Sequence, residues 1–511
     1  MAGPATLTVN AAIYRSAASG PWHAFDMWEQ SYNGGGSWVL GTTSPTADNT
    51  TSITVRNGYT VSVTNALTVD DLVIEAGGEV DASGATITIN DNTNAAVDCD
   101  VFGVLQVANV TGSSLTVSPN AGLTFENGGH YIWNGPTATI FPTAIWADGS
   151  LCENQGGTAA TPSGLSQSFY NFYWNHTTAG SVSLSNLLTT VRHELRMHGS
   201  SSSGSSVRFL SSAAVNDLRV GGDVVIEGGF VTCSGASTRN TILNLIMGGN
   251  LLINAGASLD SRNSGVGSMN NFIFTNASST QFITNAGIIG HTGDGGGTPN
   301  NWIVNNAVTV VLGSGNIALG TANNSTRDAV IVDGTLDLSG NQITGPGSLT
   351  IDPAGVLVAN GTNQVTTGLA SINYGGTLNL GTLPSLNNGD SFKVFDATAY
   401  TGVFAAIVPA TPGSGLVWDT SQLAVSGTLA VTTPGSGPDT TPTNITFTVI
   451  GNNLTLSWPS THIGWTLEVT TNSLLGTSWS AVAGSSATNQ VTIPIDTSLA
   501  DVFYRLRLTL P

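Results

Sequence analysis

Charged side chains are scarce in this chain of 511 residues, and lysine is almost missing. Asp, Glu, Lys and Arg make up 8% of the residues, Lys393 is the one lysine, and the net charge is −19. Nucleic-acid binding needs a basic face, and attraction to anionic lipid needs clustered Lys and Arg. The composition therefore argues against both kinds of partner.

Cysteine is also rare, and Cys99, Cys152 and Cys233 lie far apart without any Cys-x-x-Cys spacing. Zinc sites need closely spaced ligands, so this pattern argues against zinc. An odd number of cysteines leaves at least one thiol without a disulfide partner. Cys233 ends a strand-like run, Gly229-Phe230-Val231-Thr232-Cys233, and we expect a small buried side chain there.

Two further absences concern location. No stretch is long and apolar enough to cross a membrane, and no signal peptide is visible at Met1-Ala2-Gly3-Pro4. The low charge and the abundance of Gly, Ser, Thr and Asn are nevertheless typical of exported proteins. We therefore expect a secreted protein, extracellular or at the cell surface, with its leader trimmed and Met1 an added start.

Helical periodicity is missing as well, because Gly, Thr and Asn interrupt every window of apolar residues. The chain shows strand-like alternation and repetition instead. Residues 218–229 and 245–256 read almost alike, each with apolar residues on both sides of a Gly-Gly pair, at an offset of 27 positions. A repeat of roughly 20–30 residues built from short strands is typical of a β-solenoid. One coil cannot bury its own apolar face, so stacked coils must share a core.

The sequence thus predicts an all-β fold, a right-handed parallel β-helix with an N-terminal cap and a small C-terminal β-sandwich. Residues 1–50 are rich in aromatic residues, including Trp22 and Trp28, and we expect them to cover the first coil. A sugar-stacking platform is the alternative for these rings. Residues 51–431 carry the coils of the β-helix.

Four irregular or separate stretches complete this organisation. A longer excursion from the coils is expected at about 130–180, and a Gly-rich loop at 284–301. Residues 432–443 form a Pro/Gly/Thr linker, since Pro and Gly block regular pairing there. Residues 444–511 alternate cleanly in several short strands, which is typical of a small antiparallel sandwich.

Four stretches carry a family resemblance. They are residues 142–176 with the run Phe169-Tyr170-Asn171-Phe172-Tyr173-Trp174, the Gly-Gly coils at 218–256, residues 376–430 with Gly389-Asp390-Ser391-Phe392-Lys393, and the tail with Leu456-Ser457-Trp458-Pro459 and Phe503-Tyr504-Arg505-Leu506. The first two resemble secreted parallel β-helix proteins of Bacteroidetes-type bacteria, and the third resembles autotransporter-associated β-strand repeats. The tail resembles a module of Verrucomicrobia-type exported proteins. The resemblance implies export and a right-handed parallel β-helix, and it carries no catalytic residues.

Arginines are densest between residues 192 and 219, at Arg192, Arg196, Arg208 and Arg219. Polysaccharide lyases on β-helix folds combine a base with cationic groups that neutralise a uronate, which makes Arg192 and Arg196 candidate catalytic residues. The arginines are spread along the chain, so a cationic cluster is not evident from the sequence, and only the stacking of neighbouring coils could bring some of them together. The nearby run from His193 to His198 does not predict a metal site. Its histidines are five positions apart rather than four, and on a strand they point to opposite faces.

The run Gly290-His291-Thr292-Gly293-Asp294 resembles a fragment of the polygalacturonase β-helix hydrolases, which makes His291 and Asp294 candidate catalytic residues. The Asn-Thr-Asp and Arg-Ile-Lys motifs of those enzymes are missing, so a surface loop is the alternative. Asp70-Asp71 is the one paired carboxylate candidate, but adjacent strand residues face opposite ways. No cofactor is expected, although the carboxylates allow Ca²⁺, which prefers oxygen ligands.

Two functions fit these observations. The first is a secreted structural or adhesive β-solenoid without catalysis. Its expected partners are further copies of itself, in an oligomer or filament. The second is a carbohydrate-active β-helix, a polysaccharide hydrolase or lyase, or a carbohydrate-binding protein. A sugar site is then expected near the aromatic residues of 130–176 or the loop of 284–301.

Overall fold

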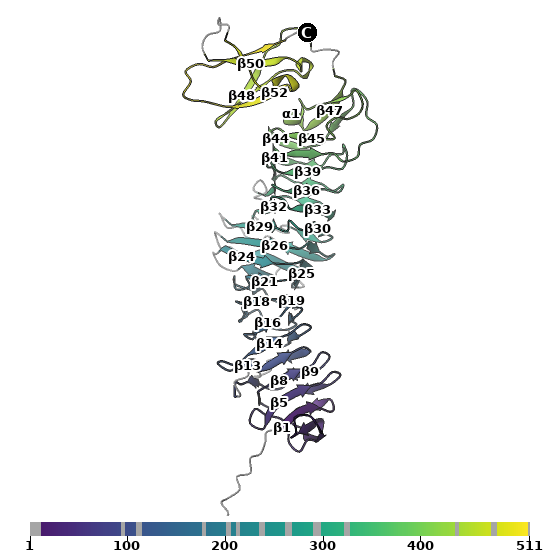
Figure 1. The fold of residues 1–511 in the computed structure, drawn as a ribbon, viewed down its shortest axis with the longest axis vertical. Coiled ribbons are helices and arrows are strands. Elements are labelled where there is room, and N and C mark those ends of the chain that lie inside the picture. The colour runs from purple at the N-terminus through teal and green to yellow at the C-terminus, as the bar shows by residue number, and fades with distance from the viewer. Residues whose placement is uncertain are drawn as a thin grey trace, which may run out of the picture.

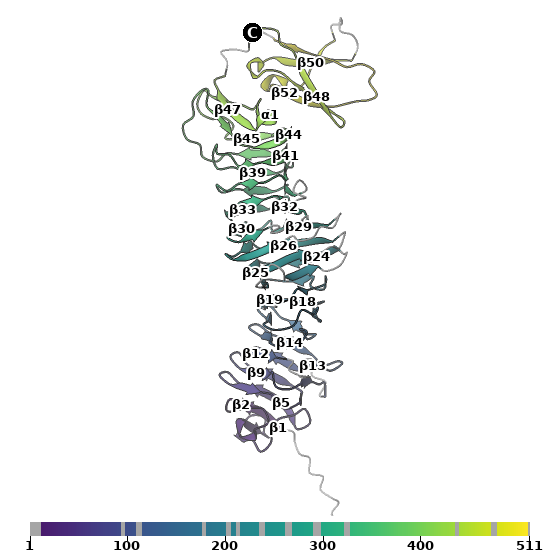
Figure 2. The same ribbon diagram turned by 180° about the vertical axis from the view of Figure 1, so that it is seen from behind.

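The computed structural model describes residues 12–92, 98–108, 115–175, 180–200, 206–210, 215–234, 241–260, 268–289, 298–320, 328–434, 439–471 and 478–508. Nearly all of the regular structure in these ranges is β, and most strands pair in parallel, which confirms the predicted parallel β-helix. The coils form an elongated stack with β1 (Ala12–Ser16) near one end and a separate C-terminal module at the other (Figure 1). Figure 2 shows the same order of coils from behind.

One sheet, the long sheet, runs through the whole stack. Its strands, each paired in parallel with the next, are β2 (Gly20–Pro21), β6 (Thr60–Ser62), β9 (Glu79–Ala82), β12 (Val104–Val107), β15 (His130–Trp133), β17 (Leu151–Asn154), β19 (Asn171–Asn175), β22 (Leu195–His198), β25 (Val224–Ser234), β27 (Leu251–Ile253), β30 (Gln281–Asn285), β33 (Thr309–Ser314), β36 (Thr335–Asp337), β39 (Val356–Val358), β42 (Thr377–Asn379) and β45 (Ala406–Val408). Parallel pairing places equivalent residues of neighbouring coils about 4.8 Å apart.

A second face consists of an 8-stranded sheet and a 10-stranded sheet. The first contains β4 (Val39–Leu40), β3 (Trp28–Ser31), β1, β5 (Thr50–Val55), β8 (Leu72–Ile74), β11 (Cys99–Val101), β14 (Leu123–Phe125) and β16 (Ile145–Trp146). The second contains β18 (Ser168–Phe169), β21 (Thr190–Val191), β24 (Val215–Val220), β26 (Ile242–Met247), β29 (Met269–Phe274), β32 (Asn300–Val304), β35 (Ala329–Val332), β38 (Ser348–Ile351), β41 (Leu369–Tyr374) and β44 (Ala397–Gly402). Only β3 breaks the parallel pattern here, because it pairs antiparallel with both β1 and β4.

Shorter strands form a third face. They are β7 (Leu67–Val69), β10 (Ile87–Ile89) and β13 (Leu115–Val117), then β20 (Val182–Ser183), β23 (Val207–Leu210), β28 (Ala257–Asp260) and β31 (Ile288–Ile289), and finally β34 (Ile317–Ala318), β37 (Ile343–Thr344) and β40 (Thr366–Thr367). The long strand β25 serves two faces, because its first residues pair in the long sheet and Gly229–Thr232 pair with β28. Each coil therefore turns from one face to the next through short corners.

In the coils around residues 218–256, the 27-residue repeat of the sequence equals the offset between residues that pair in neighbouring strands. Leu218 of β24 pairs with Leu245 of β26, and Val224 of β25 pairs with Leu251 of β27, as the offset predicts. Between the paired strands, the Gly-Gly pairs lie at one corner of successive coils. There the Gly248 amide donates to the Val220 carbonyl at 2.8 Å.

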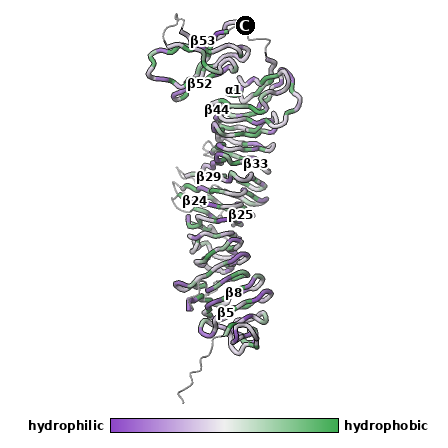
Figure 3. Tube along the Cα trace, viewed as in Figure 1, coloured by the Kyte–Doolittle hydropathy of each residue, from purple (hydrophilic) through white to green (hydrophobic). Residues whose placement is uncertain are grey.

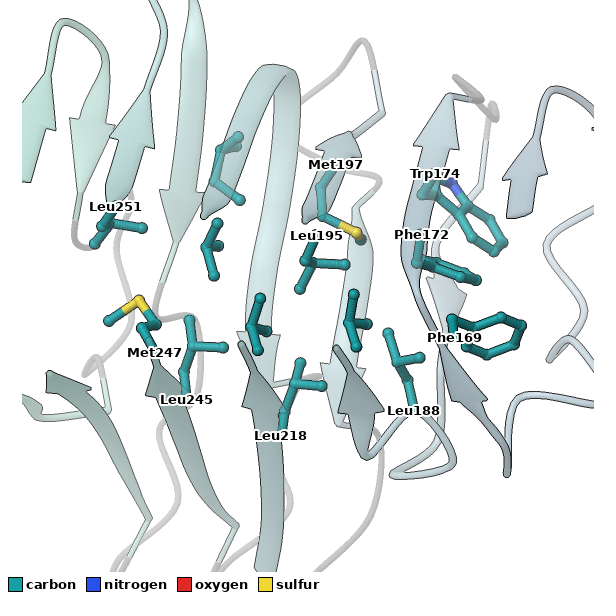
Figure 4. Packing of buried hydrophobic residues seen from close by; sticks show 14 of the residues in the cluster. Phe169, Phe172, Trp174, Leu188, Leu195, Met197, Leu218, Leu245, Met247 and Leu251 are labelled. Carbon is teal, nitrogen blue, oxygen red and sulfur yellow. The ribbon is translucent and has the colours of Figure 1, made fainter. Parts of the chain in front are cut away.

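The interior is one apolar cluster that extends from Ala12 to Leu429. Every second residue of the strands points inward, so Phe172, Leu195 and Leu251 lie in line along the long sheet opposite a row from the second face (Figure 4). The three cysteines are buried in the same core as thiols. Burial raises the pKa of the Cys99 and Cys152 thiols above their usual value, so both stay protonated. The stack thus has the continuous core that the repeat predicted.

Two sequence predictions about irregular stretches are wrong. Residues 130–180 are not an excursion, because β15, β17 and β19 continue the long sheet in register. The predicted loop at 284–301 carries strand residues at both ends, since β30 reaches Asn285, β31 covers Ile288–Ile289 and β32 begins at Asn300, and residues 290–297 lie outside the described ranges. The alternation of these short strands is difficult to recognise in the sequence, because residues 130–180 are rich in aromatic residues and residues 284–301 are rich in glycine.

Antiparallel structure follows the last coils. The strands β43 (Ser391–Lys393), β47 (Thr428–Thr432) and β46 (Val417–Asp419) form a 3-stranded sheet, and α1 (Leu423–Ser426) is a single helical turn. The C-terminal module has two antiparallel 3-stranded sheets, made by β48 (Thr446–Ile450), β49 (Asn453–Ser457) and β52 (Gln490–Pro494), and by β51 (Ser480–Ala481), β50 (Thr466–Thr470) and β53 (Phe503–Arg507). Leu456, Trp458 and Leu467 bury between them, as expected for a small sandwich.

Candidate functional site

Charged and aromatic side chains gather on the outer side of the long sheet between β15 and β25. This charged patch comprises His130, Glu153, Tyr173, Arg196 and Glu227. The register aligns three of them across successive coils, because Glu153 pairs with Tyr173 and Tyr173 pairs with Arg196. Their strand neighbours are buried in the core, so the alternation of each strand turns the patch outward.

Glu153 is the most buried member of the patch, with 6% of its surface exposed. Its carboxylate accepts hydrogen bonds from His130 Nε2 at 2.8 Å, Asn175 Nδ2 at 2.9 Å and Gln155 Nε2 at 2.9 Å. Burial opposes ionisation, but the hydrogen bonds from His130, Asn175 and Gln155 outweigh it and hold the pKa of this carboxyl below its usual value. Glu153 is therefore ionised at neutral pH, and its carboxylate accepts hydrogen bonds from three neighbouring side chains.

Tyr173, Arg196 and Glu227 form the other half of the patch. The Tyr173 hydroxyl donates a hydrogen bond to Glu227, and the Arg196 guanidinium lies 5.4 Å from the centre of the Tyr173 ring. Arg196 also pairs with Glu194 at 3.1 Å and with Glu227 at 3.8 Å. Burial, the hydrogen bond to Glu227 and nearby negative charge raise the pKa of Tyr173, so its phenol stays protonated.

Replacing Glu153 with glutamine is expected to lower the free energy of unfolding by about 1–3 kcal/mol at pH 7, because charge-assisted hydrogen bonds to a buried carboxylate are lost. The pKa of Glu153 is depressed in the folded state, so this stabilisation is present above the usual value of 4.5 and is lost as the pH falls through the folded-state pKa. Urea unfolding of wild type and Glu153→Gln between pH 3 and pH 7 checks this. The gap between the two proteins should narrow below about pH 4.5.

Glu79→Gln is the matched control, because Glu79 lies on β9 of the same sheet and its carboxylate accepts one side-chain hydrogen bond, from Thr60 Oγ1 at 3.1 Å. Its effect should be smaller than that of Glu153→Gln. An equal loss in both variants, or a gap that does not depend on pH, would contradict the role assigned to ionised Glu153.

The state of these groups limits the chemistry of the patch. A general acid at neutral pH needs a carboxyl with a raised pKa, and a tyrosine base needs a lowered one. Glu153 and Tyr173 are shifted in the opposite directions. Arg196 is held by Glu194 and Glu227, so it does not offer a free cation to a uronate. The patch is built to tie neighbouring coils together.

The four arginines do not form the cluster that a lyase would need. Arg196 lies in the patch, whereas Arg192 lies beyond β21, over the Tyr170 ring, and pairs with Asp148. Arg208 bonds to Ser181 on the third face at 2.8 Å, and Arg219 lies 3.5 Å from Asp217 on β24. Neighbouring coils do not bring these arginines together, because the four side chains leave three different faces. His291 and Asp294 lie outside the described residues.

The rings expected to bind sugar are largely interior. Phe169, Phe172, Trp174 and Trp146 are each at most 3% exposed and pack against one another or against neighbouring coils. Tyr170 is the exception, because its ring stacks on His193 with 5.1 Å between the ring centres. Alternation within β19 turns Phe172 and Trp174 inward and Tyr173 outward, whereas Tyr170 lies at the corner between β18 and β19.

A group of three carboxylates lies on the N-terminal coils, formed by Asp70, Asp71 and Asp98. The expectation that Asp70 and Asp71 face opposite ways is wrong. Asp71 has a φ of +50° and lies at the corner between β7 and β8, so the alternation of a strand does not apply to it. The repeat could have found this group, because Asp98 follows Asp71 at the same 27-residue offset as the Gly-Gly pairs.

A cavity of about 640 Å³ lies between the last coils and the C-terminal module. Its walls include Tyr374, Phe404, Leu423, Val425 and Trp458. Its polar side chains are those of asparagine, glutamine, serine and threonine together with the Tyr374 hydroxyl and the Trp458 indole, and its described lining contains no carboxylate, lysine, arginine, histidine or thiol. This cavity can enclose a ligand. The Tyr374 hydroxyl in its wall donates to the Leu423 carbonyl at 3.2 Å, and burial raises the pKa of that phenol, which does not suit it to act as a base.

Searches against protein-family models, curated proteins and solved structures returned no match to this chain. None of the helices in the described ranges is long and apolar enough to span a bilayer. The sites that distinguish the molecule are therefore the charged patch, the acidic corner at Asp70, Asp71 and Asp98, and the cavity beside the sandwich.

Proposed function

We propose that this protein is a secreted, non-catalytic β-solenoid that serves as an extracellular structural or adhesive element. The observation that carries the proposal is the charged patch, whose members bond to one another across successive coils. Such bonds brace the stack and leave no reactive group poised for a substrate. Export is supported by the low charge and by the Gly-, Ser-, Thr- and Asn-rich composition.

The stack suits a load-bearing element. Hydrogen bonds between coils run along the long axis of the molecule, and one apolar core extends from Ala12 to Leu429. The sheets pair each coil with its immediate neighbours, so length grows without widening the cross-section. Tension along the axis is then shared by the hydrogen bonds of the sheets that surround the core.

An asparagine ladder strengthens the second face in the same direction. Asn244 Nδ2 donates to Asp217 at 2.7 Å, Asn271 donates to Asn244 at 2.7 Å, and Asn301 donates to Asn271 at 2.9 Å. Stacked amides satisfy one another without the repulsion that stacked like charges would produce. The scarcity of charged residues therefore favours stacking, because equivalent positions of neighbouring coils can carry the same side chain without charge repulsion.

The outer surface is suited to a crowded extracellular setting. Hydrophilic and hydrophobic residues alternate along the coils, because inward and outward positions alternate in each strand (Figure 3). Amides and hydroxyls supply most of the outward polarity, and the net charge of −19 keeps copies of the chain apart in solution. Adhesion would then depend on particular sites, such as the cavity beside the sandwich.

Carbohydrate binding is the second candidate function, and one observation favours it. Tyr170 and His193 stack with an interplanar angle of 3°, and the Arg192 guanidinium lies 5.2 Å from the centre of the Tyr170 ring. A flat aromatic surface is suited to contact with the face of a sugar ring, whereas the Arg192 guanidinium beside it is already paired with Asp148. This platform lies next to the charged patch, on the outside of the same coils.

The test uses the purified full chain on a panel of acidic and neutral polysaccharides, assayed for new reducing ends and for unsaturated uronates. No turnover is expected, and electron microscopy is expected to show rods. Turnover that disappears in Glu153→Gln or Arg196→Gln and persists in Glu79→Gln would replace the structural proposal with the enzymatic one. Binding without turnover, lost in Tyr170→Ala, would favour the carbohydrate-binding function.

A further inference from the structure

Two successive coils bring three carboxylates to one corner at the N-terminal end of the stack. Asp70 and Asp71 lie between β7 and β8, and Asp98 directly precedes β11. Because β8 and β11 pair in parallel, the corner residues also stack, and the Leu72 amide donates to the Asp98 carbonyl at 2.9 Å. The left-handed φ of Asp71, a conformation that Asp tolerates better than most residues, bends the chain so that its carboxylate joins the other two.

The three carboxylates approach closely and are mostly shielded from water. Each offers an oxygen within 4.8 Å of the others. Asp70 and Asp98 are both 1% exposed. Both oxygens of Asp70 and Oδ1 of Asp98 are buried without a hydrogen bond of good geometry, the Asn92 backbone and the Asp98 carboxyl being the polar groups beside Asp70. Oδ2 of Asp98 accepts a hydrogen bond from the Gly122 amide at 2.6 Å.

Unpartnered oxygens of this kind demand a positive ligand. Burying a carboxylate without a partner costs several kcal/mol, and a like charge beside it adds to the cost. No lysine or arginine of the described residues forms an ion pair with Asp70 or Asp98, so a small cation is the simplest counter-charge.

We propose that the corner formed by Asp70, Asp71 and Asp98 binds one Ca²⁺ ion. Calcium lies about 2.4 Å from its oxygen ligands, so two oxygens on one ion are at most about 4.8 Å apart. The separations in this corner meet that limit. Magnesium, at about 2.1 Å, would need all of them within about 4.2 Å and a stricter octahedral geometry. The group contains no imidazole or thiolate, the ligands that zinc prefers.

The ion would link two coils through groups that otherwise repel each other. Asp70 and Asp71 come from one coil and Asp98 from the next, so binding fastens the second and third faces of adjacent coils at their shared corner. Water and backbone carbonyls would complete the six to eight oxygens that calcium takes. Because the ion binds the folded corner and not the unfolded chain, it stabilises the N-terminal coils. This inference does not depend on whether the rod is structural or binds carbohydrate.

The experiment titrates Ca²⁺ into chelator-treated full-length protein by isothermal calorimetry, with Mg²⁺ in a parallel arm. Wild type is expected to bind one Ca²⁺ per chain, and Asp98→Asn and Asp70→Asn are expected to bind it at least tenfold more weakly. Asp100→Asn is the matched control, because Asp100 has the same charge and lies on β11 two residues from Asp98, on the outward side. It should bind as wild type does.

Unfolding temperatures, measured with and without calcium, distinguish a loss of calcium binding from a general folding defect in the variants. Without calcium, Asp98→Asn and Asp70→Asn should unfold at or above the temperature of wild type, because each substitution removes charge repulsion from the corner. With calcium, wild type should gain stability and the two variants should not. Calcium binding of equal strength in all four proteins, no binding at millimolar Ca²⁺, or tighter binding of Mg²⁺ than of Ca²⁺ would each overturn the proposal.

Discussion

Valine in place of Gly248 is expected to lower the free energy of unfolding by about 3 kcal/mol or more, the upper range for overpacking a closely packed site. A Cβ atom at this position would lie 2.3 Å from the Gly221 carbonyl oxygen of the preceding coil. The same contact recurs one coil earlier, where a Cβ at Gly221 would lie 2.1 Å from the Arg192 carbonyl oxygen. The Gly-Gly pairs are therefore stacked on one another, and their backbones approach too closely for a side chain.

The cost of this substitution is large because the neighbouring atoms belong to backbone. A flexible side chain can rotate away, but the carbonyl of Gly221 can move only if the coils separate. That separation would break the hydrogen bond from the Gly248 amide to Val220 and disturb the pairing of β24 with β26. Circular dichroism during urea unfolding measures the loss, and limited proteolysis should show new cleavage in these two coils.

Gly256→Asn is the control within the same repeat unit. Gly256 has a φ of +81° and open space where a Cβ would stand, and asparagine tolerates left-handed backbone. We expect a loss below about 1 kcal/mol there. If Gly248→Val were as stable as Gly256→Asn, the close stacking of the Gly-Gly corners would be refuted.

Removing the Trp28 side chain is expected to cost about 3–5 kcal/mol and to cause self-association. Trp22 and Trp28 are fully buried at the N-terminal end of the stack, with 4.8 Å between their ring centres. The Trp22 indole donates to the Pro45 carbonyl and the Trp28 indole to the Trp22 carbonyl, each at 2.8 Å. The rings thus join three segments that cover the first coil.

Loss of this packing would release β3 and β4, the antiparallel strands that end the 8-stranded sheet. The strand β1 would then present an open edge to other chains. Trp28→Ala should show a lower unfolding temperature and a concentration-dependent mass by size exclusion with light scattering. Phe25→Ala is the control, because Phe25 lies in the same segment but is 54% exposed. A monomeric Trp28→Ala of normal stability would contradict this role.

The architecture could be predicted because its signal is periodic. Leu218 and Leu245 repeat at one offset, and that offset is the register of the sheets. The coils at 130–180 escaped prediction because bulky aromatic residues obscured their alternation and because these coils are shorter. His130 pairs with Leu151 and Leu151 with Asn171, which are closer in sequence than Leu218 and Leu245. A pattern that depends on equal coil lengths cannot detect coils of unequal length.

The charged patch and the acidic corner were harder to predict for two different reasons. Glu153, Tyr173 and Arg196 become neighbours only through the register of three coils, and the register depends on corner lengths that the sequence does not display. At the acidic corner, a single residue with left-handed backbone, Asp71, cancels the rule that adjacent strand residues face apart. Local patterns predict faces well within a strand and poorly at its ends.

The parallel register has a consequence for how such a molecule changes during evolution. Every coil raises the stack by about 4.8 Å, whatever the length of its corners. Duplication or deletion of one unit, such as residues 218–244, would shift the sandwich relative to the N-terminal end by that increment and leave the remaining coils able to pair as before. The length of the stack therefore changes in discrete steps of one coil. Evolution can alter that length without altering the residues at either end.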